Sequence, residues 1–339
     1  MAKAHQELIW ITGASQGIGK ALALAYAAQG AKVIISARNR EKLDEVCRQG
    51  QEQQLSGELI PLLLDVTDPQ QVKQVVALLI ASHRLPGRVI LNAGTHQPVE
   101  ARQFSAQVLQ HLVQVNLLGI GYLLEELLPR YAGLEYSNAN RSENQQELVS
   151  TNSHSTDSFD VTSSSDSTSH SYSAPPSYST NNRSSTSNRN LSSLNSNSPI
   201  PQLKQIALVA SVAGYRGLPT ASCYGASKAA VINLAESLRA ELYSSGIDIR
   251  LINPGFVKTP LTDKNDFEMP FLISAEQAAQ DIIKGLNGKR FEIVFPRKMA
   301  WAMKLLKWLP DRVFFPLINR STGHNQNPIK HQSQHNGQY

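Results

Sequence analysis

A tyrosine and a lysine four residues apart, Tyr224 and Lys228, are the pair in this sequence best suited to chemistry. Residues four apart on a helix share one face, so the phenol and the ammonium group would reach the same point. The pKa of an ordinary tyrosine is near 10, about three units above the pH at which a general acid works best. That gap is about 4 kcal/mol, which one cation about 4 Å away supplies at an effective dielectric near 20. We therefore expect Lys228 to lower the pKa of Tyr224 and make it a proton donor.

A serine thirteen positions before the tyrosine adds a third polar group. Ser211 follows the apolar run 206–210, which has the length and composition of a buried strand. Open α/β sheets bind their ligands at the carboxyl ends of the strands, where this hydroxyl would lie. A lone Tyr-x-x-x-Lys is more often part of a surface helix, but Ser211 at a strand end favours a catalytic site.

A glycine-rich turn at residues 12–19 indicates a dinucleotide site. It separates the apolar run 8–11, a predicted strand, from the segment 20–28, a predicted helix rich in alanine and leucine. Gly13, Gly17 and Gly19 have no side chain to hold a pyrophosphate away from the backbone, and the first N–H groups of the helix can meet its charge. Because the spacing differs from the G-x-G-x-x-G fingerprint, the turn alone would be weak support.

The end of the second predicted strand, residues 31–36, bears on the choice of coenzyme. An NAD site would place an acidic residue there to bind the ribose 2′-hydroxyl, whereas Ala37 and Arg38 follow this strand. A guanidinium suits a 2′-phosphate, so the sequence predicts NADP(H) as the cofactor. The alternative is that Arg38 is a solvated loop residue.

Taken together, these features resemble the short-chain dehydrogenase/reductase family over about residues 5–295, with one interruption. The matching motifs occur in the family's order: Thr12 to Gly19, Asp65-Val66, Asn92-Ala93-Gly94, Asn116, Ser211, Tyr224 with Lys228, and Pro254-Gly255 followed by Thr259. The family often has two asparagines before the alanine and glycine, and Leu91 replaces the first of them here.

The resemblance implies a role for each catalytic residue. Tyr224 would exchange a proton with the substrate oxygen, Lys228 would lower its pKa and hold the nicotinamide ribose, and Ser211 would bind the carbonyl oxygen. Asn116 would order a water that relays protons to Lys228. Such groups act where charge develops in the transition state.

The resemblance also implies a cofactor site, in which Asp65 would bind the adenine amino group and Thr259 the nicotinamide carboxamide. Residues 92–94 would line the adenosine side. The expected cofactor-binding residues are Gly13, Ser15, Gln16, Gly17, Ile18, Gly19, Arg38, Asp65, Val66, Asn92, Ala93, Gly94, Tyr224, Lys228, Pro254, Gly255, Val257 and Thr259.

Strand and helix patterns alternate from about residue 7 to 295, which predicts an α/β fold: one doubly wound, Rossmann-type parallel sheet with helices on both faces. We assign residues 1–298 to this catalytic domain. Residues 133–202, rich in Ser, Asn and Thr, interrupt it and are expected to be disordered because few large apolar side chains are available to offset the entropy of ordering. A tolerated insertion is favoured there over a tether or a modified segment.

Charge and composition exclude several classes of protein. The formal net charge is +5, but the segment 289–339 has nine Lys and Arg against two Asp and Glu, so the remainder is slightly acidic and no nucleic-acid-binding motif is present. Two cysteines suit a reducing compartment, and the scattered histidines predict no metal site. Neither a spanning helix nor a signal peptide is indicated, so the cytoplasm is the expected location.

The basic amphipathic tail, residues 299–339, allows two interpretations. Trp301, Leu305 and Trp308 share one face of a predicted helix, with Lys304 and Lys307 to one side. Such a stripe packs over the substrate pocket or a partner subunit more often than it binds a membrane surface, but contact of 299–318 with anionic headgroups remains the second reading. Members of the family commonly pair through helices, so a homo-oligomer is expected.

The sequence therefore predicts an NADP(H)-dependent oxidoreductase that interconverts a ketone or aldehyde and a secondary alcohol. The tail and the segment 258–272 hint at an apolar, lipid-like substrate, although fold does not fix specificity. A non-catalytic nucleotide-binding regulatory protein is the alternative from another class, and an epimerase or dehydratase is a third possibility.

Overall fold

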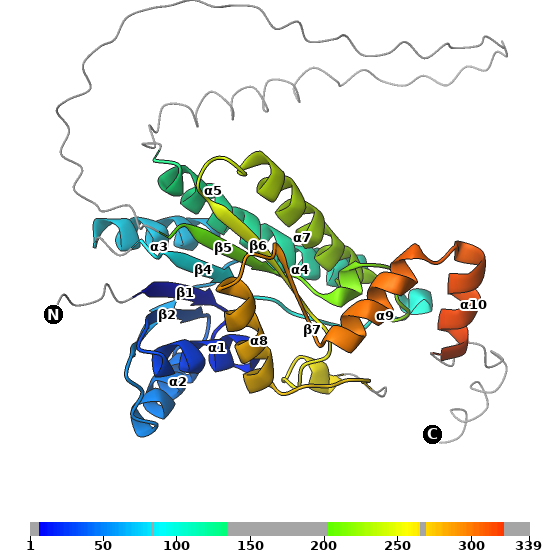
Figure 1. Cartoon of the computed structure of the whole chain (residues 1–339), viewed down its shortest axis with the longest axis horizontal. Coiled ribbons are helices and arrows are strands. Elements are labelled where there is room, and N and C mark those ends of the chain that lie inside the picture. The colour runs from blue at the N-terminus through cyan, green and yellow to red at the C-terminus, as the bar shows by residue number, and fades with distance from the viewer. Residues whose placement is uncertain (1–6, 83–84, 134–202, 265–268, 322–339) are drawn as a thin grey trace, which may run out of the picture. The chain divides into compact units, whose positions relative to one another are not determined.

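Seven parallel strands form the sheet at the centre of the fold, in the order β3-β2-β1-β4-β5-β6-β7 (Figure 1). The computed structural model describes residues 7–82, 85–133, 203–264 and 269–321. The strands are β1 Leu8–Thr12, β2 Lys32–Ala37, β3 Glu58–Leu63, β4 Arg88–Leu91, β5 Gln205–Val209, β6 Asp248–Pro254 and β7 Glu292–Phe295. This parallel order confirms the predicted doubly wound, Rossmann-type fold.

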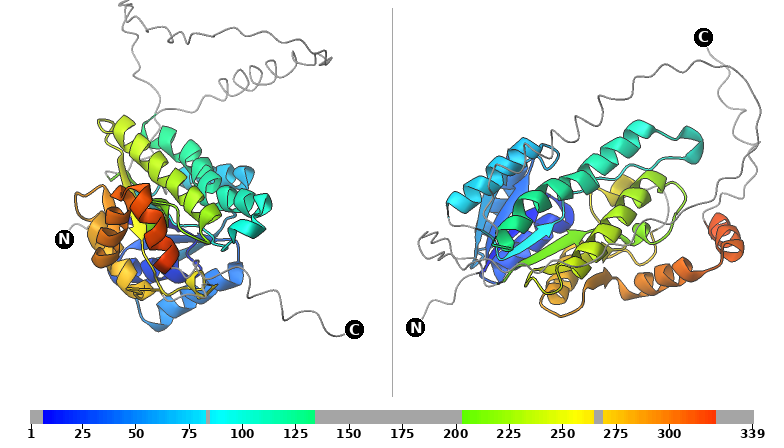
Figure 2. Two further views of the ribbon diagram at one scale, coloured as in Figure 1. Left: turned by 90° about the vertical axis from the view of Figure 1, so that its right-hand side faces the viewer. Right: turned by 90° about the horizontal axis from the view of Figure 1, so that it is seen from above.

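Helices cover both faces of the sheet (Figures 1 and 2). The helices are α1 Gly17–Ala28, α2 Arg40–Glu52, α3 Pro69–Ala81, α4 Ala106–Val113, α5 Gly119–Tyr131, α7 Ser222–Glu241, α8 Ala275–Leu286, α9 Arg297–Trp308 and α10 Asp311–Ser321. Helices α1, α2 and α8 pack in one apolar core, and α3, α5 and α7 pack in the core on the opposite face. Within β1, Ile9 and Ile11 enter the first core and Trp10 enters the second, as the two-residue period of a strand requires.

Helix α1 begins earlier than the sequence indicates, at Gly17 rather than at residue 20. Two of the glycines of the turn therefore lie in the first turn of the helix, where backbone N–H groups have no partner within the helix. Strand β1 lies between β2 and β4, and the strand order reverses there. The glycine turn thus opens at the switch point of the sheet, where folds of this type bind their ligands.

In the part of the chain that the structure describes, one helical run is long and apolar enough by length and composition to span a membrane, which the sequence pattern did not indicate. It is the continuous run Ala106–Tyr131, half of whose most apolar window is buried. Leu123, Leu124 and Leu127 of this run belong to the core on one face of the sheet. Its apolar character is therefore accounted for by packing in this core.

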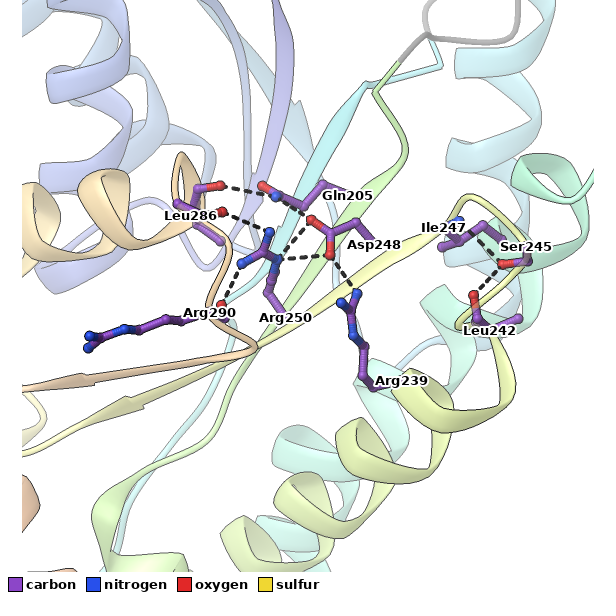
Figure 3. A network of polar contacts seen from close by, with 10 residues as sticks. Gln205, Arg239, Leu242, Ser245, Ile247, Asp248, Arg250, Leu286 and Arg290 are labelled. Carbon is purple, nitrogen blue, oxygen red and sulfur yellow. Dashed lines mark hydrogen bonds and ion pairs between the residues drawn. The ribbon is translucent and has the colours of Figure 1, made fainter.

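The amino-terminal edge of the sheet holds a buried polar network (Figure 3). Asp248, the first residue of β6, accepts hydrogen bonds from the Nε of Arg250 at 2.8 Å and from Nη1 of Arg239 at 2.7 Å. Gln205, the first residue of β5, donates to the same carboxylate at 2.8 Å. The other nitrogens of Arg250 donate to the carbonyl oxygens of Gly288 and Arg290. These contacts join β5 and β6 to the segment that enters β7.

The predicted insertion, apart from residue 133, lies outside the described residues. Its flanking elements, the end of α5 and the start of β5, are both described. Gln205 pairs in register with Arg88 and Asp248, the first residues of β4 and β6. The Tyr131 hydroxyl donates to the carbonyl oxygen of Pro86, just before β4. The insertion therefore begins and ends at the amino-terminal edge, away from the strand ends that precede Ser211 and the glycine turn.

Candidate active site

The glycine turn comes into direct contact with the segment after β4. A Cβ atom on Gly13 would lie 2.7 Å from the Cα of Ala93, and one on Gly19 would lie 2.4 Å from the carbonyl oxygen of Gly13. Gly13 and Gly17 also have positive φ values of 67° and 56°. Side chains at these positions would push the backbone apart, so glycine is required for the turn to close on its neighbour.

Hydrogen bonds from Asn92 hold the turn in place. Its side-chain nitrogen donates to the carbonyl oxygens of Thr12 at 3.0 Å and Gly13 at 3.2 Å. The hydroxyl oxygen of Thr12 accepts from the backbone N–H groups of Asn92 and Ala93, both at 3.0 Å. Asn92, which the resemblance places on the adenosine side, thus supports the turn through its amide and also lines the recess described below. The role of Thr12 was missed, although a hydroxyl that ends a buried strand is a signal for it.

A recess of about 540 Å³, including the solvent at its mouth, lies at the carboxyl ends of β4, β5 and β6. Many of the predicted site residues line it: Ile18, Asn92, Gly94, Ser211, Tyr224, Lys228, Pro254, Gly255, Val257 and Thr259. Further lining comes from residues that the sequence did not single out: Thr95, Val209, Ala210, Leu261 and Thr262. The wall therefore combines a polar cluster with aliphatic side chains.

Ser211 and Tyr224 are hydrogen-bonded to each other in this recess. Tyr224 lies in the first turn of α7. Ser211 follows β5, where its hydroxyl accepts from the N–H of Ala213 at 3.2 Å and lies 3.4 Å from the carbonyl oxygen of Pro254. Burial raises the pKa of Tyr224, and the hydrogen bond with Ser211 opposes that rise. The serine thus favours the deprotonated form of the tyrosine.

Lys228 is one turn along α7 from Tyr224, and its Nζ lies 5.8 Å from the centre of the tyrosine ring. This Nζ donates to the carbonyl oxygen of Val209 at 3.0 Å. Burial lowers the pKa of Lys228 to about 8. The structure thus differs from the expectation that Lys228 lowers the pKa of Tyr224. The physical reason is that desolvation disfavours the charged form of each group, and it dominates both shifts.

Asn116 lies in a single π-helical turn, Gln114–Leu118, between α4 and α5. It exchanges two hydrogen bonds with the backbone of Thr95, at 2.8 and 3.0 Å, and donates to the hydroxyl of Ser227 at 3.0 Å. Ser227 in turn donates to the carbonyl oxygen of Tyr224 at 2.8 Å. Both donors of the Asn116 amide are used in these bonds, so its side chain holds the start of α7 against the segment after β4.

The ring of His96 lies edge-on to that of Tyr224, with centroids 4.6 Å apart. His96, Thr95 and Ser227 were not among the site residues predicted from the sequence. Their signal was position, because Thr95 and His96 directly follow the Asn-Ala-Gly motif and Ser227 lies one turn after Tyr224.

Arg38 directly follows β2 and approaches Asp65, which follows β3. Their side-chain nitrogen and oxygen atoms are 4.0 Å apart, and the side chain of Arg38 is 67% exposed. The other carboxylate oxygen of Asp65 accepts from the backbone and hydroxyl of Thr67. Nearby, Lys42 donates to the side chain of Gln16 in the glycine turn, at 3.3 Å. Two cations therefore lie beside the turn, and no acidic residue ends β2.

The described residues fit a dinucleotide. A Cβ on Gly17 would lie 3.1 Å from the side chain of Thr259, and one on Gly94 would lie 3.4 Å from the Nζ of Lys228. Backbone without side chains therefore lies both at the first turn of α1, where Thr259 leaves little room for a side chain, and near Lys228. Such a cradle suits a pyrophosphate at the helix start and a ribose near the lysine. Ser15 and Val66 belong to the turn and to the segment after β3, but neither lines the recess.

Comparisons with known proteins agree with this geometry. The family described as short chain dehydrogenase matches residues 7–141 and 201–269. An uncharacterized oxidoreductase of Myxococcus xanthus is 26% identical over 314 residues, covering 93% of this chain and 97% of the relative. A 3-oxoacyl-[acyl-carrier-protein] reductase of Thermotoga maritima is 25% identical over 254 residues, 75% of each chain.

A solved structure of similar fold is a short-chain dehydrogenase from Sphingobium yanoikuyae in complex with NADPH. It has a TM-score of 0.61 and 19% identity, covering 98% of this chain and all of that one. The family match spans the glycine turn, the recess and the Tyr-x-x-x-Lys pair. This chain therefore belongs to the short-chain dehydrogenase family, whose members are oxidoreductases.

Proposed function

We propose that this protein is an NADP(H)-dependent oxidoreductase that interconverts a ketone or aldehyde and a secondary alcohol. The observation that carries the proposal is the meeting of Ser211, Tyr224 and Lys228 in one recess, which Ile18 of the glycine turn also lines. A regulatory nucleotide-binding protein would have no chemical need of these three side chains together beside the cofactor cradle.

The proposed mechanism assigns a proton or a contact to each side chain. The nicotinamide coenzyme supplies the hydride that reaches the carbonyl carbon. The hydroxyls of Ser211 and Tyr224 bind the carbonyl oxygen, and Tyr224 gives it the proton that completes the alcohol. The phenolate left behind is stabilised and reprotonated by Lys228, whose lowered pKa of about 8 makes it a ready donor near neutral pH. In the oxidative direction each transfer reverses.

Asn116 keeps these groups aligned in the proposed mechanism. Its contacts with Thr95 and Ser227 fix the first turn of α7, on which Tyr224 and Lys228 lie. The water relay that the family resemblance implies is compatible with these bonds, because the Oδ1 of Asn116 accepts one of them and has a second lone pair. We therefore propose that Asn116 positions α7 in addition to its expected role in the relay.

A preference for NADP(H) rests on the residues that end β2. Arg38 is exposed and only loosely paired with Asp65, so its guanidinium can turn to a 2′-phosphate beside Ala37. Loss of this charge-assisted contact corresponds to about 1.5–3 kcal/mol, a tenfold to hundredfold change in affinity. Arg38→Asp should therefore raise the KM for NADPH by about that factor and spare the KM for NADH. Equal use of both coenzymes by the wild type would contradict the preference.

The substrate is proposed to be apolar. Ile18, Val257 and Leu261 line the recess, and Phe271 and Leu272 are exposed in the segment after it. The 3-oxoacyl reductase among the relatives acts, by its name, on an acyl ketone, which is consistent with this chemistry. We place the enzyme in the cytoplasm and expect a homo-oligomer, as for other members of the family.

The test follows NADPH absorbance with the purified protein against aliphatic, steroid and acyl-thioester ketones. Turnover should rise with the apolar size of the ketone, and net consumption of NADPH should equal the alcohol formed. Binding of NADPH without turnover of any ketone or alcohol would instead support the regulatory alternative. Product formation without net coenzyme consumption would support an epimerase or dehydratase.

A further inference from the structure

Helices α9 and α10 form an arm after the last strand of the sheet (Figure 1; right view of Figure 2). One side of α9 packs against the body of the protein. Met299 and Met303 are buried against Val212, in a cluster that also includes Phe256. A Cβ on Gly255, which lines the recess, would lie 3.1 Å from the side chain of Met299. The inner side of α9 therefore supports the wall of the candidate active site.

Two neighbouring residues in the segment after Ser211 fasten this arm. Arg216 donates to the carbonyl oxygen of Leu306 at 2.8 Å and to the carboxylate of Asp311 at 2.6 Å, and its guanidinium lies 3.8 Å from the centre of the Phe314 ring. Tyr215 donates to Glu292, which also pairs with Lys304 of α9. The arm is thus held to the same segment that carries the candidate catalytic serine.

The opposite side of the arm is exposed and apolar. Trp301, Leu305 and Trp308 follow the i, i+4, i+7 spacing of one helical face and are 78%, 67% and 83% exposed. In α10, Val313, Phe315 and Leu317 are exposed as well. Of the fourteen large hydrophobic side chains exposed in the described part of the chain, six lie between residues 301 and 317. This concentration indicates an interaction surface rather than scattered surface residues.

The charges around this face favour a lipid surface over a protein partner. Between residues 297 and 320 the sequence has six Lys and Arg and one acidic residue, Asp311, whose carboxylate is already paired with Arg216. On the helical wheel of α9, Arg297 and Lys298 flank the tryptophan stripe on its two sides. Lysine is depleted in buried protein interfaces, whereas tryptophan flanked by lysine is typical of helices that lie at a membrane surface.

We propose that the exposed face of α9 and α10, built on Trp301, Leu305 and Trp308, docks the protein on an anionic lipid surface. Docking would place the recess beside the bilayer, because the inner side of the same helix supports the recess wall. An apolar ketone could then pass from the lipid to the recess without crossing water; this last step rests on the proposed function, but docking does not.

The tryptophan content makes docking directly measurable. The protein has three tryptophans, and Trp10 is fully buried, so a change in emission on adding lipid reports on Trp301 and Trp308. We would add vesicles of phosphatidylcholine alone, or mixed with phosphatidylglycerol, to the full-length protein at low salt. The emission should shift to the blue and the protein should sediment with the mixed vesicles only. Added salt should release it.

Two double variants test whether vesicle binding depends on this face or on exposed apolar side chains in general. Trp301→Ser with Trp308→Ser should weaken vesicle binding, measured by sedimentation, by at least about tenfold. The matched control, Leu78→Ser with Tyr243→Ser, removes two exposed apolar side chains elsewhere and should bind like the wild type. Circular dichroism checks that both variants are folded.

Three results would overturn the proposal: no binding of the wild type to mixed vesicles at low salt, equal loss in both variants, or self-association through this face without vesicle binding. Turnover of a short, water-soluble ketone should be the same in the wild type and the tryptophan variant. A protein that docks but turns over no ketone would refute the proposed function alone, since the binding readout does not depend on activity.

Discussion

Two buried cations, at the amino-terminal and carboxyl-terminal ends of the strands, differ in whether a carboxylate is paired with them. At the amino-terminal edge Arg250, 6% exposed, is paired with the carboxylate of Asp248, and its other nitrogens reach two carbonyl oxygens. At the carboxyl-terminal edge Lys228, 4% exposed, donates to the carbonyl oxygen of Val209, and no carboxylate in the described part of the chain is paired with it. The first charge is compensated by its neighbours, and the second is not.

The contrast indicates that the amino-terminal ends of the strands contribute stability and that the carboxyl-terminal ends hold the candidate catalytic groups. Burying an uncompensated ammonium opposes folding, because desolvation penalises its charged form. Such a group is retained where its charge and its proton are needed. A paired guanidinium, in contrast, becomes costly only when its partner is removed. Mutations at the two edges should therefore move activity and stability in different directions.

The largest expected effect is on turnover and comes from Lys228→Met. Activity should fall by about 10²–10⁴-fold, because the phenolate of Tyr224 loses its proton source and its cation. The same variant should be more stable at pH 7, by about 2 kcal/mol, since the cost of the buried charge of about 3 kcal/mol disappears while one hydrogen bond of about 1 kcal/mol is lost. Steady-state kinetics and urea unfolding of the cofactor-free protein measure the two quantities. A variant both inactive and destabilised would contradict this account of the lysine.

The reverse pattern is expected from Asp248→Asn. Removing one charge of the network leaves Arg250 buried without its carboxylate, which should cost about 3 kcal/mol of stability. Turnover at a temperature where the variant is folded should match the wild type, because the network lies at the other end of β6 from the recess. Unfolding midpoints and kcat test this pair of outcomes. A large loss of kcat in a folded variant would mean that the two edges are not independent.

The lowered pKa of Lys228 predicts how the free energy of unfolding changes with pH. The unfolded lysine keeps its proton up to its ordinary pKa of 10.5, whereas the folded one releases it near its lowered pKa of about 8. The unfolded state thus binds more protons between these values, so this group makes stability rise with pH from about 8 to 10.5. Below pH 8 its destabilising effect is complete and constant. The stability difference between wild type and Lys228→Met, followed by urea unfolding, should shrink over that window; a constant difference would contradict the burial of the charge.

The smallest effect is expected from shortening the segment between α5 and β5. Its flanking residues lie at the amino-terminal edge, so deletion of residues 143–197 should leave kcat within about twofold of the wild type. Activity and thermal unfolding of the deletion variant are the measurements. Loss of turnover in a folded variant would show that this segment reaches the other edge.

Much of the fold was predictable because its signals are local. Apolar runs such as 206–210 and the glycines of the first turn are typical of a parallel α/β sheet. The strand order was not predicted and comes from the structure. The start of α1 was misplaced by three residues because glycine has low helix propensity, and the turn's contact with Ala93 that allows it there is long-range.

The composition of the recess was predictable, whereas its electrostatics was not. The spacing of Tyr224 and Lys228 placed both side chains on one face of α7, but the extent of burial that sets both pKa values depends on the packed structure. Thr95 and Ser227 were missed because their hydrogen bonds to Asn116 join segments distant in sequence. The role of Arg216 depends on where α10 folds back, and no local pattern reveals that contact.

The most direct test of the central claim is single-turnover reduction of a ketone by NADPH with Tyr224→Phe, at equal concentrations of folded protein. NADPH should still bind, since the glycine turn and Lys228 are unchanged, while the rate of its oxidation should fall by about 10²–10⁴-fold. A variant that oxidises NADPH at the wild-type rate would show that the proton comes from another group.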